Sequence, residues 1–169
     1  MSQIAGKSQT VRRAAKFDSL EQEAYLQLWR SYDRLRAFED ELFARHDLSA
    51  QQYNALRLLQ AVYPATLPVS AVGAKLISRA PDMTRLLDKL EERGLVRRER
   101  KAANRRVVEV GIADAGLTLL DSLAAEVSTC HERQLGHLTD DKLRELIAML
   151  KEARRPHEEA AGPWSGGES

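Results

Sequence analysis

Apolar residues recur at helical spacing through most of this 169-residue chain. In residues 18–45 they follow three-, four- and seven-residue steps, which predicts one long amphipathic helix. The same spacing predicts two more long helices later in the chain, one over residues 114–137 and one from Thr139 to about Arg155. We expect Pro156 to end the last helix, because proline cannot donate a backbone hydrogen bond.

Between the long helices the apolar pattern is shorter and more varied. Ser49 and Gln52 form a capping box that begins one helix, and Pro64 marks the end of that helix. A short helix follows over "LPVSAVGAKL", and a turn separates it from an amphipathic helix over residues 81–93. Gly94 then ends this helix, since glycine readily adopts the left-handed conformation found at helix C-termini.

After Gly94 the spacing of apolar residues changes from the helical repeat to alternation with polar residues. The segments "LVRRER" and "RRVVEVGI" predict two short strands that pair as a hairpin, with "KAAN" at its tip. A short helix, a turn, an amphipathic helix and a hairpin in this order form a winged helix-turn-helix. The chain is therefore predicted to be mainly α-helical with a small β-hairpin wing.

Positive charge is concentrated in this middle part. Residues 79–106 hold ten Lys or Arg and five Asp or Glu, although the whole chain has a net charge of only +1. The N-terminal half of the second helix of a helix-turn-helix enters the major groove, where Arg85 is placed to bind guanine. Thr84 is placed to touch a thymine methyl group or a phosphate, and Asp88 to accept from cytosine or to orient Arg85. A charged helix face is often only solvated, but the adjacent basic wing favours DNA as the partner.

The residues expected to contact double-stranded DNA come from helix starts, from the exposed face of the second helix and from the wing. Hydroxyls and free N–H groups at helix starts often hold phosphate, and basic side chains of a wing neutralise the DNA backbone. The full set is Ser70, Ser78, Pro81, Asp82, Thr84, Arg85, Asp88, Lys89, Arg100, Lys101, Asn104, Arg105 and Arg106.

Composition and motifs argue against several other classes of protein. The single cysteine, Cys130, allows no intrachain disulfide bond. No apolar run is long enough for a signal peptide or a membrane span, so we expect a cytoplasmic protein without membrane contact. The sequence has no Gly-rich phosphate loop or G-x-S-x-G motif, and its four histidines are far apart or out of register for a metal site. We therefore expect neither an enzyme nor a cofactor.

Two segments resemble the MarR family of bacterial winged helix-turn-helix transcriptional regulators. They are "MTRLLDKLEERGLVRR", which covers the second helix and the first wing strand, and "NRRVVEVGIADAG", which covers the return strand and the next helix start. The resemblance extends over about residues 20–155. Asn104 departs from the Asp that the family commonly has at the wing tip. Ile112 and Ala113 replace the family's usual Leu-Thr, which leaves Asp114 as the alternative cap.

The resemblance implies a homodimer that binds a palindromic DNA site. Together with the predicted elements, it divides the chain into a flexible N-terminal arm (1–17), a helical dimerisation region (18–48 and 114–155), the winged helix-turn-helix (49–113) and a flexible tail (156–169). It also implies a transcriptional regulator, most simply a repressor, that a small phenolic or anionic ligand releases from DNA.

Three questions stay open at this point. Trp29, His46 and Tyr53 are the candidate ligand-binding residues, although packing explains these side chains equally well. Cys130 is the candidate for a thiol that senses oxidants, although a packed thiol is the simpler interpretation. A winged helix used only for protein–protein contact is the remaining alternative, and the basic wing argues against it.

Overall fold

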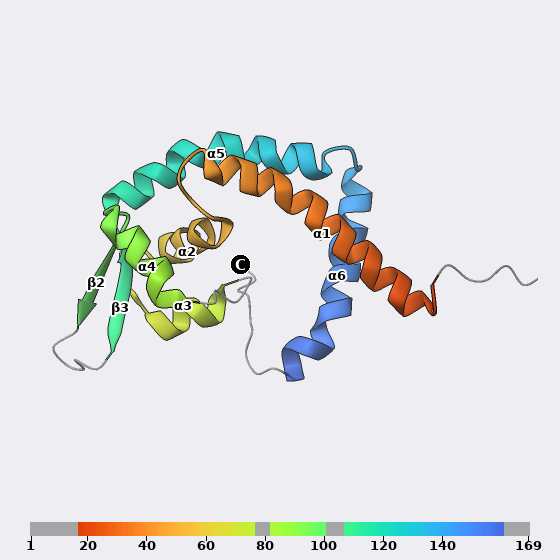
Figure 1. Cartoon of the computed structure of the whole chain (residues 1–169), viewed down its shortest axis with the longest axis horizontal. Coiled ribbons are helices and arrows are strands. Elements are labelled where there is room, and N and C mark those ends of the chain that lie inside the picture. Colours follow the sequence, from red (N-terminus) through yellow and green to blue (C-terminus); the bar gives the residue numbers. More distant parts are fainter. Residues whose placement is uncertain (1–16, 77–81, 101–106, 161–169) are drawn as a thin grey trace, which may run out of the picture. The chain divides into compact units, whose positions relative to one another are not determined.

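The computed structural model describes residues 17–76, 82–100 and 107–160. The predicted mainly helical fold with a small hairpin is confirmed, and the structure adds a two-residue strand that was not predicted. The helices are α1 (Leu20–Ala44), α2 (Ala50–Ala61), α3 (Val69–Lys75), α4 (Met83–Glu92), α5 (Asp114–Leu135) and α6 (Asp140–Ala160), and the strands are β1 (Leu67–Pro68), β2 (Val96–Arg100) and β3 (Val108–Ile112) (Figure 1).

The three strands form one antiparallel sheet with the order β1–β3–β2. In the hairpin, Val96 is opposite Ile112 and Arg100 is opposite Val108. Because side chains alternate along a strand, Val96 and Arg98 point to the same face of β2, and this face is the more buried one. The added strand β1 pairs with β3 and leads directly into α3, so it joins the helix-turn-helix to the wing.

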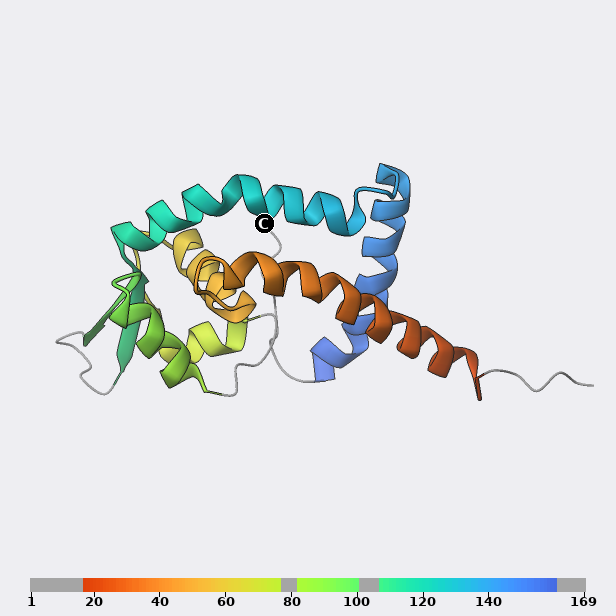
Figure 2. The same ribbon diagram turned by 45° about the horizontal axis from the view of Figure 1, so that its top comes forward.

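The core of the winged helix is made of aliphatic side chains from α2, α4 and the sheet. Helix α2 packs against α3, α4, α5 and β3, and it lies among these elements in both ribbon views (Figures 1 and 2). The side chains of Leu56, Leu59, Leu87, Leu90 and Ile112 are all fully buried in one cluster. Burial of this many large aliphatic groups is the main stabilising contribution to the domain.

Helix α4 has well-defined ends. Its N-cap is Asp82, whose side-chain Oδ1 accepts a hydrogen bond from the backbone N–H of Arg85 at 2.9 Å. Asp82 has extended backbone angles and the helix begins at Met83, later than the expected start at residue 81; Pro81 itself lies outside the described residues. At the other end Gly94 has a φ of 66°, and the N–H of Leu95 donates to the carbonyl of Leu90 at 2.9 Å, which confirms Gly94 as the stop.

Helix α5 begins against the wing. Its N-cap is Ala113, which makes no side-chain hydrogen bond, so the expectation that Asp114 acts as the cap is wrong. Asp114 is instead the first helical residue, where its charge suits the positive end of the helix dipole. A Cβ on Gly116 would lie 2.3 Å from the carbonyl oxygen of Leu95, so this close approach of helix and strand requires glycine.

Helix α6 continues past its proline. The prediction that Pro156 ends this helix is wrong, because the helix runs to Ala160 and also includes part of the expected tail. The loss of one backbone hydrogen bond at Pro156 is compatible with a helix whose side chains bridge the proline. Arg154 Nε lies 2.7 Å from Oε1 of Glu158, one helical turn later.

The chain divides into two compact units, one up to Arg36 and one from Ala37 onward. In the described part of the first unit, α1 begins at a cap formed by Ser19, whose Oγ accepts from the N–H of Gln22 at 3.1 Å. This part of α1 exposes an apolar and aromatic row consisting of Leu20, Tyr25, Leu28, Trp29 and Tyr32.

Candidate nucleic-acid interface

The exposed side of α4 presents polar side chains from the first two turns of the helix. Thr84, Arg85 and Lys89 are exposed, whereas Leu87 and Leu90 on the opposite side are buried in the core. This is the division that a helix needs in order to pack on its own domain and still enter a major groove. The structure therefore keeps three predicted contact residues together on one solvent-facing surface.

Asp88, also predicted at this surface, is bound to the wing. Its Oδ1 accepts from Nη1 of Arg98 at 2.6 Å. The sequence predicts that Asp88 accepts from cytosine or orients Arg85, and it contains no local signal that pairs Asp88 with Arg98. In the structure the two residues form an ion pair, and a second carboxylate, that of Glu91, lies 3.6 Å from the same nitrogen of Arg98.

A second arginine ties the C-terminal end of α4 to the turn between α1 and α2. Nη1 of Arg93 donates to the carbonyl of Asp47 at 2.6 Å, and Nη2 donates to the carbonyl of His46 at 3.1 Å. Asp47 has a φ of 52°, a left-handed conformation in which its carbonyl accepts this bond. This contact could not be predicted from the sequence, because its partners are backbone groups 46 and 47 residues away.

The other predicted DNA contacts fall into two groups. Ser70 is exposed on α3, Asp82 is exposed as the N-cap of α4, and Arg100 is exposed at the last residue of β2. The remainder lie outside the described residues, namely Ser78, Pro81, Lys101, Asn104, Arg105 and Arg106.

A hollow of about 340 Å³ lies between the last turns of α1 and the middle of α5. Apolar atoms of Phe38 and Leu42 and the charged groups of Glu41, Arg45, Glu126 and Arg133 contribute to its lining, together with Ala125, Thr129 and Cys130. The guanidinium of Arg133 lies 5.0 Å from the centre of the Phe38 ring, within range of a cation–π contact. The hollow therefore combines an aromatic face with two cationic and two anionic groups.

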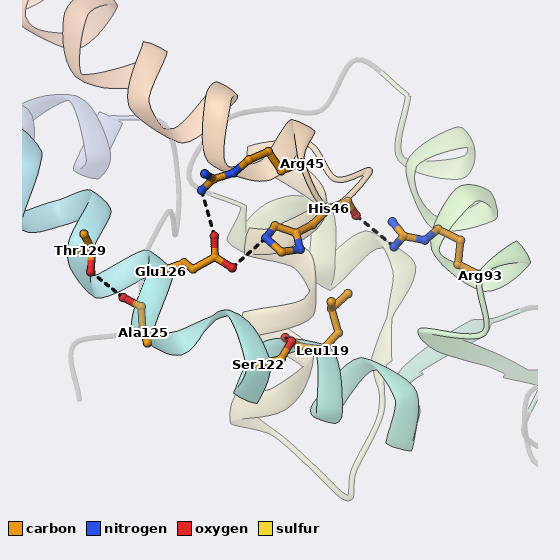
Figure 3. A network of polar contacts seen from close by, with 8 residues as sticks. All are labelled: Arg45, His46, Arg93, Leu119, Ser122, Ala125, Glu126 and Thr129. Atoms are coloured by element: carbon orange, nitrogen blue, oxygen red, sulfur yellow. Dashed lines mark hydrogen bonds and ion pairs between the residues drawn. The ribbon is translucent and has the colours of Figure 1, made fainter.

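Glu126 connects this hollow to the turn that Arg93 holds. Its carboxylate lies between Arg45 Nη2 at 2.9 Å and His46 Nε2 at 3.1 Å (Figure 3). Arg93 approaches the backbone of the same histidine from α4 in that view. These contacts bring together the turn after α1, the C-cap residue of α4 and the middle of α5, with partners up to 81 positions apart in the sequence.

The three residues predicted to bind a ligand have different surroundings. Trp29 belongs to the first unit, where its ring lies 6.1 Å from that of Tyr25. Tyr53 stacks on Phe43 with ring centres 4.6 Å apart. His46 is linked to the hollow through its hydrogen bond to Glu126. Arg45 lines the hollow and was not among the predicted ligand-binding residues, which are aromatic or histidine side chains.

Cys130 is buried, with an exposed fraction of 5%. Burial raises the pKa of its thiol, and the nearby carboxylate of Glu39 acts in the same direction. A raised pKa lowers the fraction of reactive thiolate at neutral pH. This favours the interpretation of Cys130 as a packed side chain.

Two further observations apply to residues 17–76, 82–100 and 107–160. Within these ranges no group of three or more His, Cys, Asp or Glu residues is arranged to hold a metal ion. Within the same ranges, each helix is too short or too polar to cross a lipid bilayer.

Comparison with known proteins identifies the middle of the chain. The model of the MarR family matches residues 48–108, a range that includes α2, α3, α4, β2 and the first residue of β3. The crystal structure of a MarR transcription factor from Planctomyces limnophilus is similar over 80% of this chain and 98% of that one, with 57% sequence identity and a TM-score of 0.65.

Two more distant structures are similar in fold. A mutant of MarR from E. coli complexed with operator DNA is 21% identical, with a TM-score of 0.69 over 80% of this chain and 98% of that one. The structure of BpsR from Bordetella bronchiseptica, whose DNA binding is regulated by 6-hydroxynicotinic acid, is 20% identical, with a TM-score of 0.67 over 82% of this chain and 97% of that one.

Proposed function

The chain belongs to the MarR family of DNA-binding transcriptional regulators, and we propose that it is a homodimeric repressor of a palindromic operator that a small ligand releases. The observation that carries this proposal is the surface of α4 described above. Its exposed Thr84, Arg85 and Lys89 stand beside a hairpin with further exposed basic residues. Specific DNA binding requires both base contacts from such a helix and phosphate contacts around it.

Exposed apolar side chains support the homodimer. Trp29 and Tyr25 are exposed on α1, and Ile147 and Met149 are exposed on α6. Long amphipathic helices normally bury such side chains. A second copy of the chain would cover them, and the twofold symmetry of such a dimer matches the symmetry of a palindromic DNA site. A twofold dimer presents two α4 helices to successive major grooves, about 34 Å apart.

The hollow between α1 and α5 supports release by a ligand. Arg45 is already paired with Glu126, so an anionic group would meet Arg133 and compete with Glu126 for Arg45, while Phe38 offers an apolar face to an aromatic ring. A phenolic or anionic aromatic molecule of small size fits this chemistry. The ligand must bind the DNA-free conformation more tightly in order to release DNA. Regulation of BpsR by 6-hydroxynicotinic acid is a precedent of that chemical class in a protein of the same fold.

The experiment that tests the DNA-binding proposal is selection of bound duplexes from random fragments, followed by measurement of Arg85→Ala. Loss of one bidentate guanine contact should cost about 1–3 kcal/mol on the selected duplex and relax the preference at one base pair in each half-site. Arg57→Ala is the matched control, since it removes the same charge from an exposed position of α2.

An equal loss of affinity of Arg85→Ala on selected and random duplexes would contradict base recognition by Arg85. Failure to select any inverted repeat would contradict the operator proposal as a whole. Small phenols and aromatic acids are then screened for release of the selected duplex, and lack of release by every such compound would count against the ligand class.

A further inference from the structure

The basic side chains around α4 do not all face solvent, and Arg98 is the clearest exception. It is the third residue of β2 and shares its face with the buried Val96. Its side chain is 21% exposed and turns toward α4. By contrast, its neighbours Arg97 and Arg100 on the same strand are exposed.

The guanidinium of Arg98 is held by three groups of α4. Nη1 donates to Oδ1 of Asp88 at 2.6 Å and lies 3.6 Å from Oε2 of Glu91, and Nη2 donates to the carbonyl of Thr84 at 3.1 Å. Thr84 and Asp88 lie one turn apart, so the planar group bridges a full turn of the helix. That turn contains Arg85, the proposed base-reading residue.

The orientation of this guanidinium is maintained at a cost. Its Nε is buried and has no hydrogen-bond partner among the described residues. A buried unpaired N–H is unfavourable, so the ion pair and the bond to Thr84 must outweigh that penalty. An arginine used for phosphate binding instead needs its guanidinium free to reach the duplex.

We propose that Arg98 is a positioning residue, which with Asp88 fixes the first wing strand to α4 and thereby sets the position of the wing relative to the base-reading surface. This deepens the proposed function, because it concerns how the same DNA-binding surface is organised. Arg98 then contributes to affinity for an operator without contacting DNA.

Asp88 provides a test in which the two interpretations predict opposite signs. If Arg98 binds phosphate and Asp88 merely lies near DNA, removal of the Asp88 carboxylate should tighten binding, since it removes repulsion from the backbone. If the pair positions the wing, removal of either partner should weaken binding to the selected duplex. The effects of the two changes should then not add, because both remove the same interaction.

The experiment measures dissociation constants on the selected duplex and on a random duplex at several salt concentrations. Arg98→Ala and Asp88→Ala should each lower affinity for the selected duplex about tenfold, and the double variant should be no weaker than the weaker single variant. The salt slope of Arg98→Ala should equal that of the wild type, whereas loss of a phosphate contact lowers the slope by about 0.9. Arg57→Ala, which removes the same charge from an exposed position of α2, is the control for affinity, and Arg97→Ala, at the position before Arg98 on β2, is the control for folding because it keeps the bridge.

Arg98→Lys is a second variant that keeps the charge. One ammonium group cannot reproduce the planar bridge to Asp88 and Thr84, so affinity should stay well below that of the wild type. Full recovery by lysine, a lower salt slope for Arg98→Ala, or tighter binding by Asp88→Ala would each overturn the proposal. Unchanged thermal unfolding relative to Arg97→Ala shows that the variants are folded.

A measurement on the DNA-free protein separates this proposal from the operator proposal. Hydrogen exchange of β2 and the first turn of α4 should accelerate in Arg98→Ala, while exchange of α2 should not. Unchanged exchange in β2 and α4 would overturn the positioning role even if an operator is found. If no duplex can be selected, the operator proposal fails, and the exchange result still decides whether Arg98 holds the wing.

Discussion

The winged helix and the long helices differ in how far they bury their apolar residues. In the winged helix, Leu56, Leu87 and Leu90 are completely buried. In the long helices, Trp29 of α1 is 59% exposed and Ile147 of α6 is 52% exposed. The long helices join the core only in part, through residues such as Phe43 at the end of α1 and Leu123 of α5, and among the described residues the apolar side chains named on α1 and α6 are left uncovered.

This difference indicates which part of the protein is complete as a single chain. A sheet, a short helix and two amphipathic helices enclose the core of the winged helix from several sides. A long helix with an exposed apolar row needs another surface, and the proposed dimer supplies one. The following variants test this comparison, from the largest expected effect to the smallest.

Leu87→Ala should have the largest effect. It removes a fully buried side chain of α4 and leaves a cavity, so the free energy of unfolding should fall by about 2–5 kcal/mol. Urea unfolding at fixed protein concentration measures this change. Lys89→Ala on the same helix is the control and should change stability by less than about 0.5 kcal/mol. Similar losses for both variants would show that α4 is not packed as described.

Trp29→Ala should weaken the proposed homodimer. A large aromatic side chain at a dimer interface typically contributes about 2 kcal/mol or more, so the dimer dissociation constant should rise roughly 30-fold. Sedimentation equilibrium measures the constant directly. Arg30→Ala, at the next position of α1, is the comparison. A dissociation constant that Trp29→Ala leaves unaltered would remove this row of α1 from the proposed interface.

Ser49→Ala should have the smallest effect. Together with Thr139→Ala it compares the cap of α2 in the winged helix with the cap of the long helix α6. Ser49 Oγ accepts from the N–H of Gln52 at 3.2 Å, and Gln52 Oε1 accepts from the N–H of Ser49 at 2.8 Å. Loss of this cap should reduce the free energy of unfolding by about 1 kcal/mol. Thr139 Oγ1 accepts at 3.5 Å, so Thr139→Ala should cost less. Urea unfolding measures both, and a larger loss for Thr139→Ala would reverse the comparison.

Local signals account for what was predicted correctly about the fold. Ser49 and Gln52, three residues apart, and the glycine after Arg93 specify helix ends through contacts within a few residues. The alternation of Val108, Val110 and Ile112 likewise predicts a strand. The prediction for Pro156 was wrong because the rule for proline is a local tendency, and the helix runs to Ala160 despite the backbone hydrogen bond that proline cannot donate. The strand β1 was not predicted because two residues are too few to show an alternating apolar pattern. Its assignment depends on its pairing with β3.

The helical periods, the caps, the hairpin and the concentration of basic residues follow from neighbours along the chain and could be predicted without coordinates. Which of those basic residues are held by other groups of the protein depends on the folded arrangement. Arg98 turns toward Asp88 and Arg93 reaches the carbonyls of His46 and Asp47, whereas Arg85 stays exposed. The strength of an ion pair depends on the distance between its two charges in the folded protein, and the number of charged residues in a sequence does not specify that distance.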